Sequence, residues 1–281
     1  MADAAPEPWL PLSVRDEPDR LEEFMAVREG VPIGAQRSLV DWCHALYSRK
    51  GRETRNELLK LFETAANRRV PDRVFNFSDG WADELTEDDA LLLDAIHYSL
   101  HWATGTDRSV LSGILRTGRS VYRVGQGEGD RWELQKTYSD ELIDLVEATA
   151  GGSGRAAEHL RIAWSNIAGR QPDADKACWE ATKAVEVAAR RVITPRDDTT
   201  HLSKMLGEMK ANPDRWEIVL TPDESIERIM GMMRIVLQEG HRHGDENKPI
   251  GVTPEAAEIV VQTAVVLVHW FESGFVRRVS S

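Results

Sequence analysis

The last long apolar segment, residues 253–271, constrains the fold more than any other stretch of the chain. Thr253-Pro254-Glu255 places an N-cap residue before a proline, which indicates that a helix begins there. The apolar positions of that helix are Ala257, Val260, Val261, Ala264, Leu267, Val268 and Phe271. A helix that is apolar on nearly all sides must be covered by other helices or by a second subunit. The sequence therefore predicts a bundle with this helix at its centre or in a dimer interface.

Helical spacing of apolar residues continues through the rest of the C-terminal half. It predicts helices over residues 156–164, 174–192, 202–209 and 226–237. Before them, Gly151-Gly152-Ser153-Gly154 has the composition of a linker, so the domain boundary is placed there. We expect residues 155–281 to form a helical bundle.

Residues 18–150 are expected to form a separate helical N-terminal domain, after a flexible arm at residues 1–17 that is rich in proline, alanine and acid. Apolar residues recur at helical spacing over 21–25, 39–47, 58–65, 90–102, 107–116 and 140–148. Residues 71–80 have the composition of a turn. Two β-prone runs flank a glycine-rich loop within residues 120–136, which predicts one small β-hairpin. The expected fold class is therefore mainly α.

Composition narrows the classes of function. The net charge of -12 excludes a protein that coats nucleic acid through its overall field, so any RNA site must be local. Cys43 and Cys178 lie in apolar helical patterns, which is typical of buried thiols in a reducing compartment. The sequence shows no secretion signal and no stretch of about 20 apolar residues. A cytoplasmic protein without a membrane span is expected.

A permanent cation and two imidazoles gather around the predicted end of the helix over 226–237. Arg234 and His241 are seven residues apart and share one face if the helix extends that far, and His243 follows. An arginine beside a histidine suits metal-independent cleavage of an RNA backbone, because arginine stabilises the phosphate while histidine moves the proton. The same residue types also complement the dipole at a helix C-terminus, so spacing alone leaves both interpretations open.

Several short motifs occur in a recognisable order. They are residues 156–164 (Ala-Ala-Glu-His-Leu-Arg-Ile-Ala-Trp), 172–177, 184–186, 201–207, Arg242-His243-Gly244 and the final alanine- and valine-rich helix. In this order, residues 155–275 resemble the C-terminal domain of bacterial abortive-infection proteins, which belong to the HEPN superfamily. The resemblance implies an HEPN-like helical bundle that often acts as a metal-independent ribonuclease.

The resemblance also implies a set of site residues. The superfamily pattern is an arginine followed, after four to six residues, by a histidine, and Arg234 with His241 fits at the long limit. His243, within Arg242-His243-Gly244, matches the His-Gly signature of the abortive-infection branch, so either histidine is a candidate and Arg242 is an alternative to Arg234. Glu186 is the candidate to orient an arginine through a bidentate ion pair.

For Glu186 the alternative is a surface ion pair with Arg190, four residues further along the same helix. For the chain as a whole, the resemblance implies a bacterial defence-type protein that acts in abortive infection or as a toxin. Its HEPN-like domain would cleave RNA as a homodimer. The alternative is a catalytically inactive dimerisation or partner-binding module. RNA and a second copy are the expected partners, and the N-terminal domain is the candidate surface for an antitoxin or a sensor partner.

Two further features have simpler interpretations. His97 and His101 are spaced as zinc ligands can be, but no third ligand follows, so histidines in a core or an interface are preferred. The basic stretch at residues 49–55 contains interleaved acid, which favours a solvated, salt-bridged face over an RNA or partner surface. No metal site and no cofactor are expected.

Overall fold

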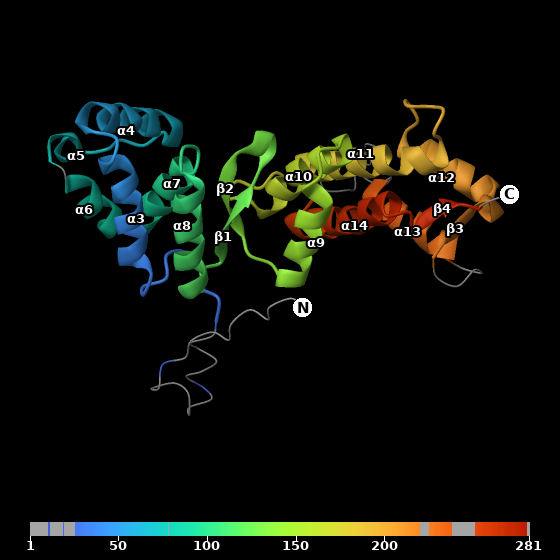
Figure 1. Cartoon of the computed structure of the whole chain (residues 1–281), viewed down its shortest axis with the longest axis horizontal. Helices are drawn as coiled ribbons and strands as arrows, with labels where there is room; N and C mark the ends of the chain where they lie inside the picture. The colour runs from blue at the N-terminus through green and yellow to red at the C-terminus, as the bar shows by residue number, and fades with distance from the viewer. Residues whose placement is uncertain are drawn as a thin grey trace. The chain divides into compact units, whose positions relative to one another are not determined.

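The computed structural model describes residues 11, 19, 26–77, 79–219, 225–237 and 251–279 (Figure 1). Within these residues the chain forms 12 helices and two small antiparallel sheets, which confirms the mainly α fold class. The chain divides into two compact units. The first comprises the described residues up to Gly125 together with Arg131–Thr137, and the second comprises Gln126–Asp130 and the described residues from Tyr138 onward.

The first unit is a set of helices followed by a hairpin. Its elements are α3 (Gln36–Ser48), α4 (Arg52–Ala66), α5 (Asp72–Asn76), α6 (Gly80–Glu87), α7 (Asp89–Ser99), α8 (Gly105–Thr117), β1 (Tyr122–Gln126) and β2 (Trp132–Lys136). β1 pairs with β2, as predicted for residues 120–136. The interval 71–80, expected to be turn-like, contains α5, a helix too short to show apolar periodicity.

The core of the first unit is rich in aromatic side chains. Tyr47 contacts Trp81 and Trp102 edge-on, with ring centroids 5.6 and 5.5 Å apart. Phe62 contacts Trp81 in the same manner, at 5.8 Å. Such edge-to-face pairs add to the stabilisation that burial of the rings provides. These contacts hold α3, α4, α6 and the end of α7 together.

The second unit is a helical bundle. Its elements are α9 (Asp140–Ala150), α10 (Arg155–Ala168), α11 (Ala174–Ile193), α12 (Leu202–Ala211), β3 (Trp216–Ile218), α13 (Ser225–Leu237), α14 (Pro254–Glu272) and β4 (Val276–Arg278). The short helical turn at Glu128–Asp130, η1, packs against α10. The helix α9 packs against α10 and α14 and so belongs to this unit, whereas the sequence analysis placed it before a boundary at residues 151–154.

The helix α14 has the central position expected from its sequence. Thr253 caps it by accepting a hydrogen bond from the Ala256 amide, and Pro254 occupies its first turn. It packs against α9, α10, α11 and α13 (Figure 1). Val261 and Ala264 on it are fully buried. Alanines also fill the contact between α10 and α11, where their small side chains permit close packing.

A second strand pair was not predicted. β3 and β4 run antiparallel, with Trp216 opposite Arg278 and Ile218 opposite Val276. Each strand has only three residues, so neither shows an alternating pattern long enough to recognise. The pair ties the residues after α14 to the connection between α12 and α13.

Candidate functional site

Arg234 lies in the last turn of α13, on the exposed side of that helix. Ile235 beside it is also exposed, whereas Met233 and Val236 are fully buried. This alternation follows from helical periodicity, because the apolar stripe faces α12 and α14. The structure therefore leaves the guanidinium group at the surface, directly before residues 238–250.

The chain is tied to α11 on both sides of residues 238–250. Thr182 Oγ1 donates a hydrogen bond to the Val236 carbonyl at 3.0 Å, and both groups are buried. On the other side, the Val252 amide donates to Asp175 Oδ1 at 3.2 Å. Asp175 and Thr182 are seven residues apart on one stripe of α11, which corresponds to roughly 10 Å along the helix axis. The candidate residues His241, Arg242 and His243 lie outside the described residues.

Glu186 follows on the same stripe of α11, one turn after Thr182. Its Oε1 accepts a hydrogen bond from the Leu202 amide at 2.9 Å, and it lies 3.6 Å from His201 Nδ1. The glutamate therefore satisfies the first free amide of α12, a task usually performed by an N-cap side chain. Among the described residues it forms no ion pair with Arg234.

Arg190, the alternative partner of Glu186, is engaged elsewhere. Its Nε and Nη2 donate to the Thr200 carbonyl at 3.2 and 3.0 Å. Both side chains thus hold the connection between α11 and α12.

Sequence reasoning missed a partly buried polar pair between α10 and α11. His159 Nδ1 lies 2.6 Å from Glu180 Oε2, and Lys183 Nζ lies 3.4 Å from the other carboxylate oxygen. The carboxylate at Nδ1 fixes the orientation of the imidazole ring between the two helices. Their helical spacing could have revealed them. His159 follows the buried Ala156 by three residues and Glu180 follows the buried Ala177 by three, so both polar residues lie on core-facing sides of their helices.

An exposed tryptophan accompanies this pair on α11. Trp179 is 55% exposed, and the Lys183 ammonium lies 5.0 Å from the centre of its ring. In sequence, Trp179 falls between Asp175 and Thr182, the residues that bond Val252 and Val236. An exposed aromatic ring with a cation over it is suited to stacking against a nucleic-acid base.

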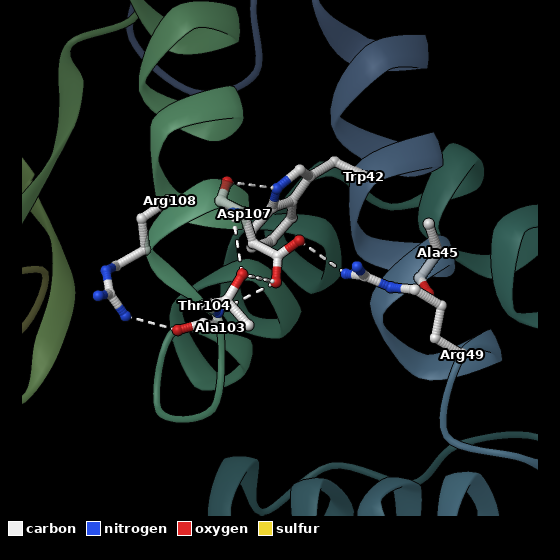
Figure 2. Close-up of polar contacts among 7 residues, drawn as sticks. All are labelled: Trp42, Ala45, Arg49, Ala103, Thr104, Asp107 and Arg108. Atoms are coloured by element: carbon white, nitrogen blue, oxygen red, sulfur yellow. Dashed lines mark hydrogen bonds and ion pairs between the residues drawn. The ribbon is translucent and has the colours of Figure 1, made fainter.

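The first unit contains a polar cluster with a structural role (Figure 2). Asp107 accepts hydrogen bonds from Arg49 at 2.7 Å and from the Thr104 hydroxyl at 2.8 Å, and its carbonyl accepts one from Trp42 Nε1. Burial acts to raise the pKa of Asp107, but the hydrogen bonds from Arg49 and Thr104 outweigh it and hold the pKa below its ordinary value. With its oxygens satisfied, the carboxylate links α3 to α8.

Two other sequence features also serve the fold. His97 Nδ1 lies 3.3 Å from the Leu134 amide, and His101 Nδ1 lies 2.9 Å from the Tyr98 carbonyl. Arg55, from the basic stretch, is buried and donates to the Val74 carbonyl. Among the described residues, no group of three or more acidic, histidine or cysteine side chains is arranged to hold a metal ion.

In comparisons with known proteins, the chain matches no family model, no curated protein and no solved structure. In the described ranges, every helix is either too short or too polar to cross a lipid bilayer.

Proposed function

We propose that this protein is a bacterial defence-type ribonuclease that acts in abortive infection or as a toxin. Its HEPN-like second unit cleaves RNA without a metal and acts as a homodimer. The observation that carries the proposal is the exposure of Arg234 at the end of α13, directly before the segment with His241, Arg242 and His243. The bonds from Thr182 and Asp175 support it further, because they hold both flanks of that segment on α11.

The proposed reaction is an intramolecular transesterification. His241 or His243 takes the proton of a ribose 2′-hydroxyl, whose oxygen attacks the adjacent phosphorus. The bond from phosphorus to the 5′-oxygen breaks, and that oxygen leaves with a proton. Arg234 and Arg242 stabilise the charge that develops on the phosphate. The products are a 2′,3′-cyclic phosphate and a 5′-hydroxyl.

Trp179 and Lys183 are proposed to hold the RNA beside this site. The chain has a net charge of -12, so its overall field opposes RNA and local contacts must provide the affinity. Stacking on an exposed tryptophan contributes about 1–3 kcal/mol per base and tolerates any sequence. Lys183 adds a cation at the same place.

The test is incubation of the purified full chain with mixed cellular RNA and tRNA in EDTA, followed by analysis of the ends formed. We expect cyclic phosphate ends from the unmodified protein, and none from a His241→Ala, His243→Ala double variant. Arg234→Gln should lower the rate by about two orders of magnitude, as loss of a charge-stabilising group does. Arg228→Gln is the matched control, because Arg228 is also exposed on α13 and should matter little.

The alternative function is a catalytically inactive dimerisation or partner-binding module. It is favoured by exposed apolar side chains on three helices of the second unit, namely Trp179, Ile235 and Ile259, which are 55%, 45% and 58% exposed. Intact RNA with every protein, together with a dimer in sedimentation experiments that Ile259→Asp dissociates, would support this alternative. An antitoxin or a sensor partner that binds the first unit is compatible with the ribonuclease and with the inactive module.

A further inference from the structure

A cavity of about 560 Å³ opens in the first unit between residues 28–38 and the C-terminal half of α8. Two arginines, Arg28 and Arg119, line it together with the hydroxyl residues Ser38 and Thr117. Val110 and Ile114 supply apolar surface. None of the described residues that line it is acidic. Its volume falls in the range of small-molecule sites, about 300–1,000 Å³.

The backbone fixes the two arginines beside one another. The Arg28 amide donates to the Arg119 carbonyl at 2.9 Å, and the Val121 amide donates to the Arg28 carbonyl at 2.9 Å. Arg119 has a φ of 54°, in the left-handed region that side chains with a Cβ atom disfavour. Such strain persists only where the surroundings enforce it, and it is common at ligand sites.

The end of α8 is held against the other wall of the cavity. A Cβ atom added to Gly118 would lie 2.7 Å from the Cβ of Ala35, so only glycine permits this approach. Ala35 is itself buried and precedes the first residue of α3. The cavity is therefore formed by rigid contacts rather than by loosely attached side chains.

Two side chains of like charge line the cavity. Arg28 is half-buried, and within the part of the chain that the structure describes its guanidinium group has no hydrogen bond and no ion pair. Burial lowers the pKa of Arg119, and the nearby charge of Arg28 lowers it further. Two like charges that line one cavity repel one another, and a bound anion would relieve that repulsion.

We propose that this cavity binds a phosphorylated small molecule with an apolar body, about the size of a nucleoside monophosphate. Arg28 and Arg119 bind the phosphate, because planar guanidinium groups form paired hydrogen bonds with its oxygens. Ser38 and Thr117 supply further hydrogen bonds, and Val110 and Ile114 contact the apolar body. This site lies wholly in the first unit and does not depend on the proposed ribonuclease activity.

The experiment is calorimetric titration of the full chain with adenosine monophosphate, inorganic phosphate, adenosine and hexanoate at constant ionic strength. We expect adenosine monophosphate to bind at one site, inorganic phosphate to bind more weakly and adenosine not to bind. Arg28→Gln and Arg119→Asn should each weaken binding of adenosine monophosphate at least about tenfold, since each removes a charged hydrogen-bonding partner. Asparagine is chosen at position 119 because it tolerates a positive φ.

Arg116→Gln is the matched control, because Arg116 is exposed on α8 and does not line the cavity. It should change the affinity less than about twofold, a difference of only ~0.4 kcal/mol. The His241→Ala, His243→Ala double variant should bind as the unmodified protein does, which separates this site from the ribonuclease proposal. Failure of both phosphate compounds to bind, binding unaffected by Arg28→Gln, or hexanoate binding as tightly as adenosine monophosphate would each overturn the assignment.

Discussion

Thr182 Oγ1 lies within hydrogen-bonding distance of two carbonyl groups, that of Cys178 on its own helix at 2.9 Å and that of Val236 on α13 at 3.0 Å. The second contact joins two helices whose residues are 54 positions apart in sequence. Carbonyl groups in the last turn of a helix have no partner within that helix, so Val236 needs one from outside. Thr182 provides it, to a carbonyl two residues after Arg234 in the sequence.

Thr182→Val should therefore destabilise the second unit. The substitution keeps the shape of the side chain but leaves the buried Val236 carbonyl without its hydrogen bond, which costs about 1–3 kcal/mol. Thermal unfolding would measure the change. Thr263→Val is the control, because the Thr263 hydroxyl bonds the Ile259 carbonyl of its own helix, at 2.6 Å, and no other helix among the described residues. Equal stability of the Thr182 variant and the unmodified protein would show that the contact does not hold α13.

Two glycines should respond in opposite directions to alanine. At Gly80 an added Cβ would lie 2.9 Å from the Arg73 carbonyl oxygen, a backbone atom that cannot easily move, so Gly80→Ala should destabilise the first unit. Gly207 lies within α12 with open space around it, so Gly207→Ala should stabilise the protein by about 0.5–1 kcal/mol. Urea denaturation of both variants gives the comparison, and stabilisation by Gly80→Ala would contradict the described packing of α5 against α6.

Asp107→Asn should reduce stability in a pH-dependent manner. The pKa of Asp107 in the folded protein lies below its ordinary value of about 3.9, so its contribution is present above that pH and is lost as the pH falls through the folded-state pKa. The free energy of unfolding should thus differ between the variant and the unmodified protein at pH 7, by about 1 kcal/mol, and the difference should shrink as the pH falls through the folded-state pKa. Arg49→Met should give the same convergence. A gap that stays constant with pH would rule out this role of the carboxylate.

The two cysteines should be unreactive in the folded protein. Cys43 and Cys178 are buried and form no disulfide, as expected from the sequence, and burial raises the pKa of the Cys43 thiol to about 12. Because the thiolate is the reactive form, a thiol reagent such as dithionitrobenzoate should modify neither residue at pH 8 until the protein unfolds. Rapid labelling of either thiol in the native protein would contradict the packing described for it.

The sequence predicted those parts of the fold in which local signals and packing agree. The helix start at Thr253-Pro254 and the central position of α14 followed from capping chemistry and from apolar residues on all its sides. It did not predict β3 and β4, because the pairing of Trp216 with Arg278 joins segments about 60 residues apart through strands of three residues. Local patterns contain no information on such a contact.

The residues of the candidate sites also divide into those that local patterns indicate and those that depend on contacts between distant segments. Arg234 was found from its spacing to the histidines, and its exposure follows from helical periodicity. That Glu186 orients an arginine stays a prediction. The hydrogen bond that its carboxylate accepts from the Leu202 amide was not predicted, because it depends on how α12 returns to α11. The cavity between Arg28 and Arg119 was not predicted, since it exists only because a backbone pairing brings together residues 91 positions apart (119 − 28).

The β1–β2 hairpin contains residues of both units. Its strands belong largely to the first unit, but Gln126–Asp130 at its tip groups with the second, where Glu128 forms an ion pair with Lys176 at 2.8 Å. The chain consequently changes unit three times, after residues 125, 130 and 137. A single recombination point within the gene therefore cannot replace one whole unit without also replacing part of the other. A gene fusion that keeps both folds intact must carry the hairpin together with α10 and α11.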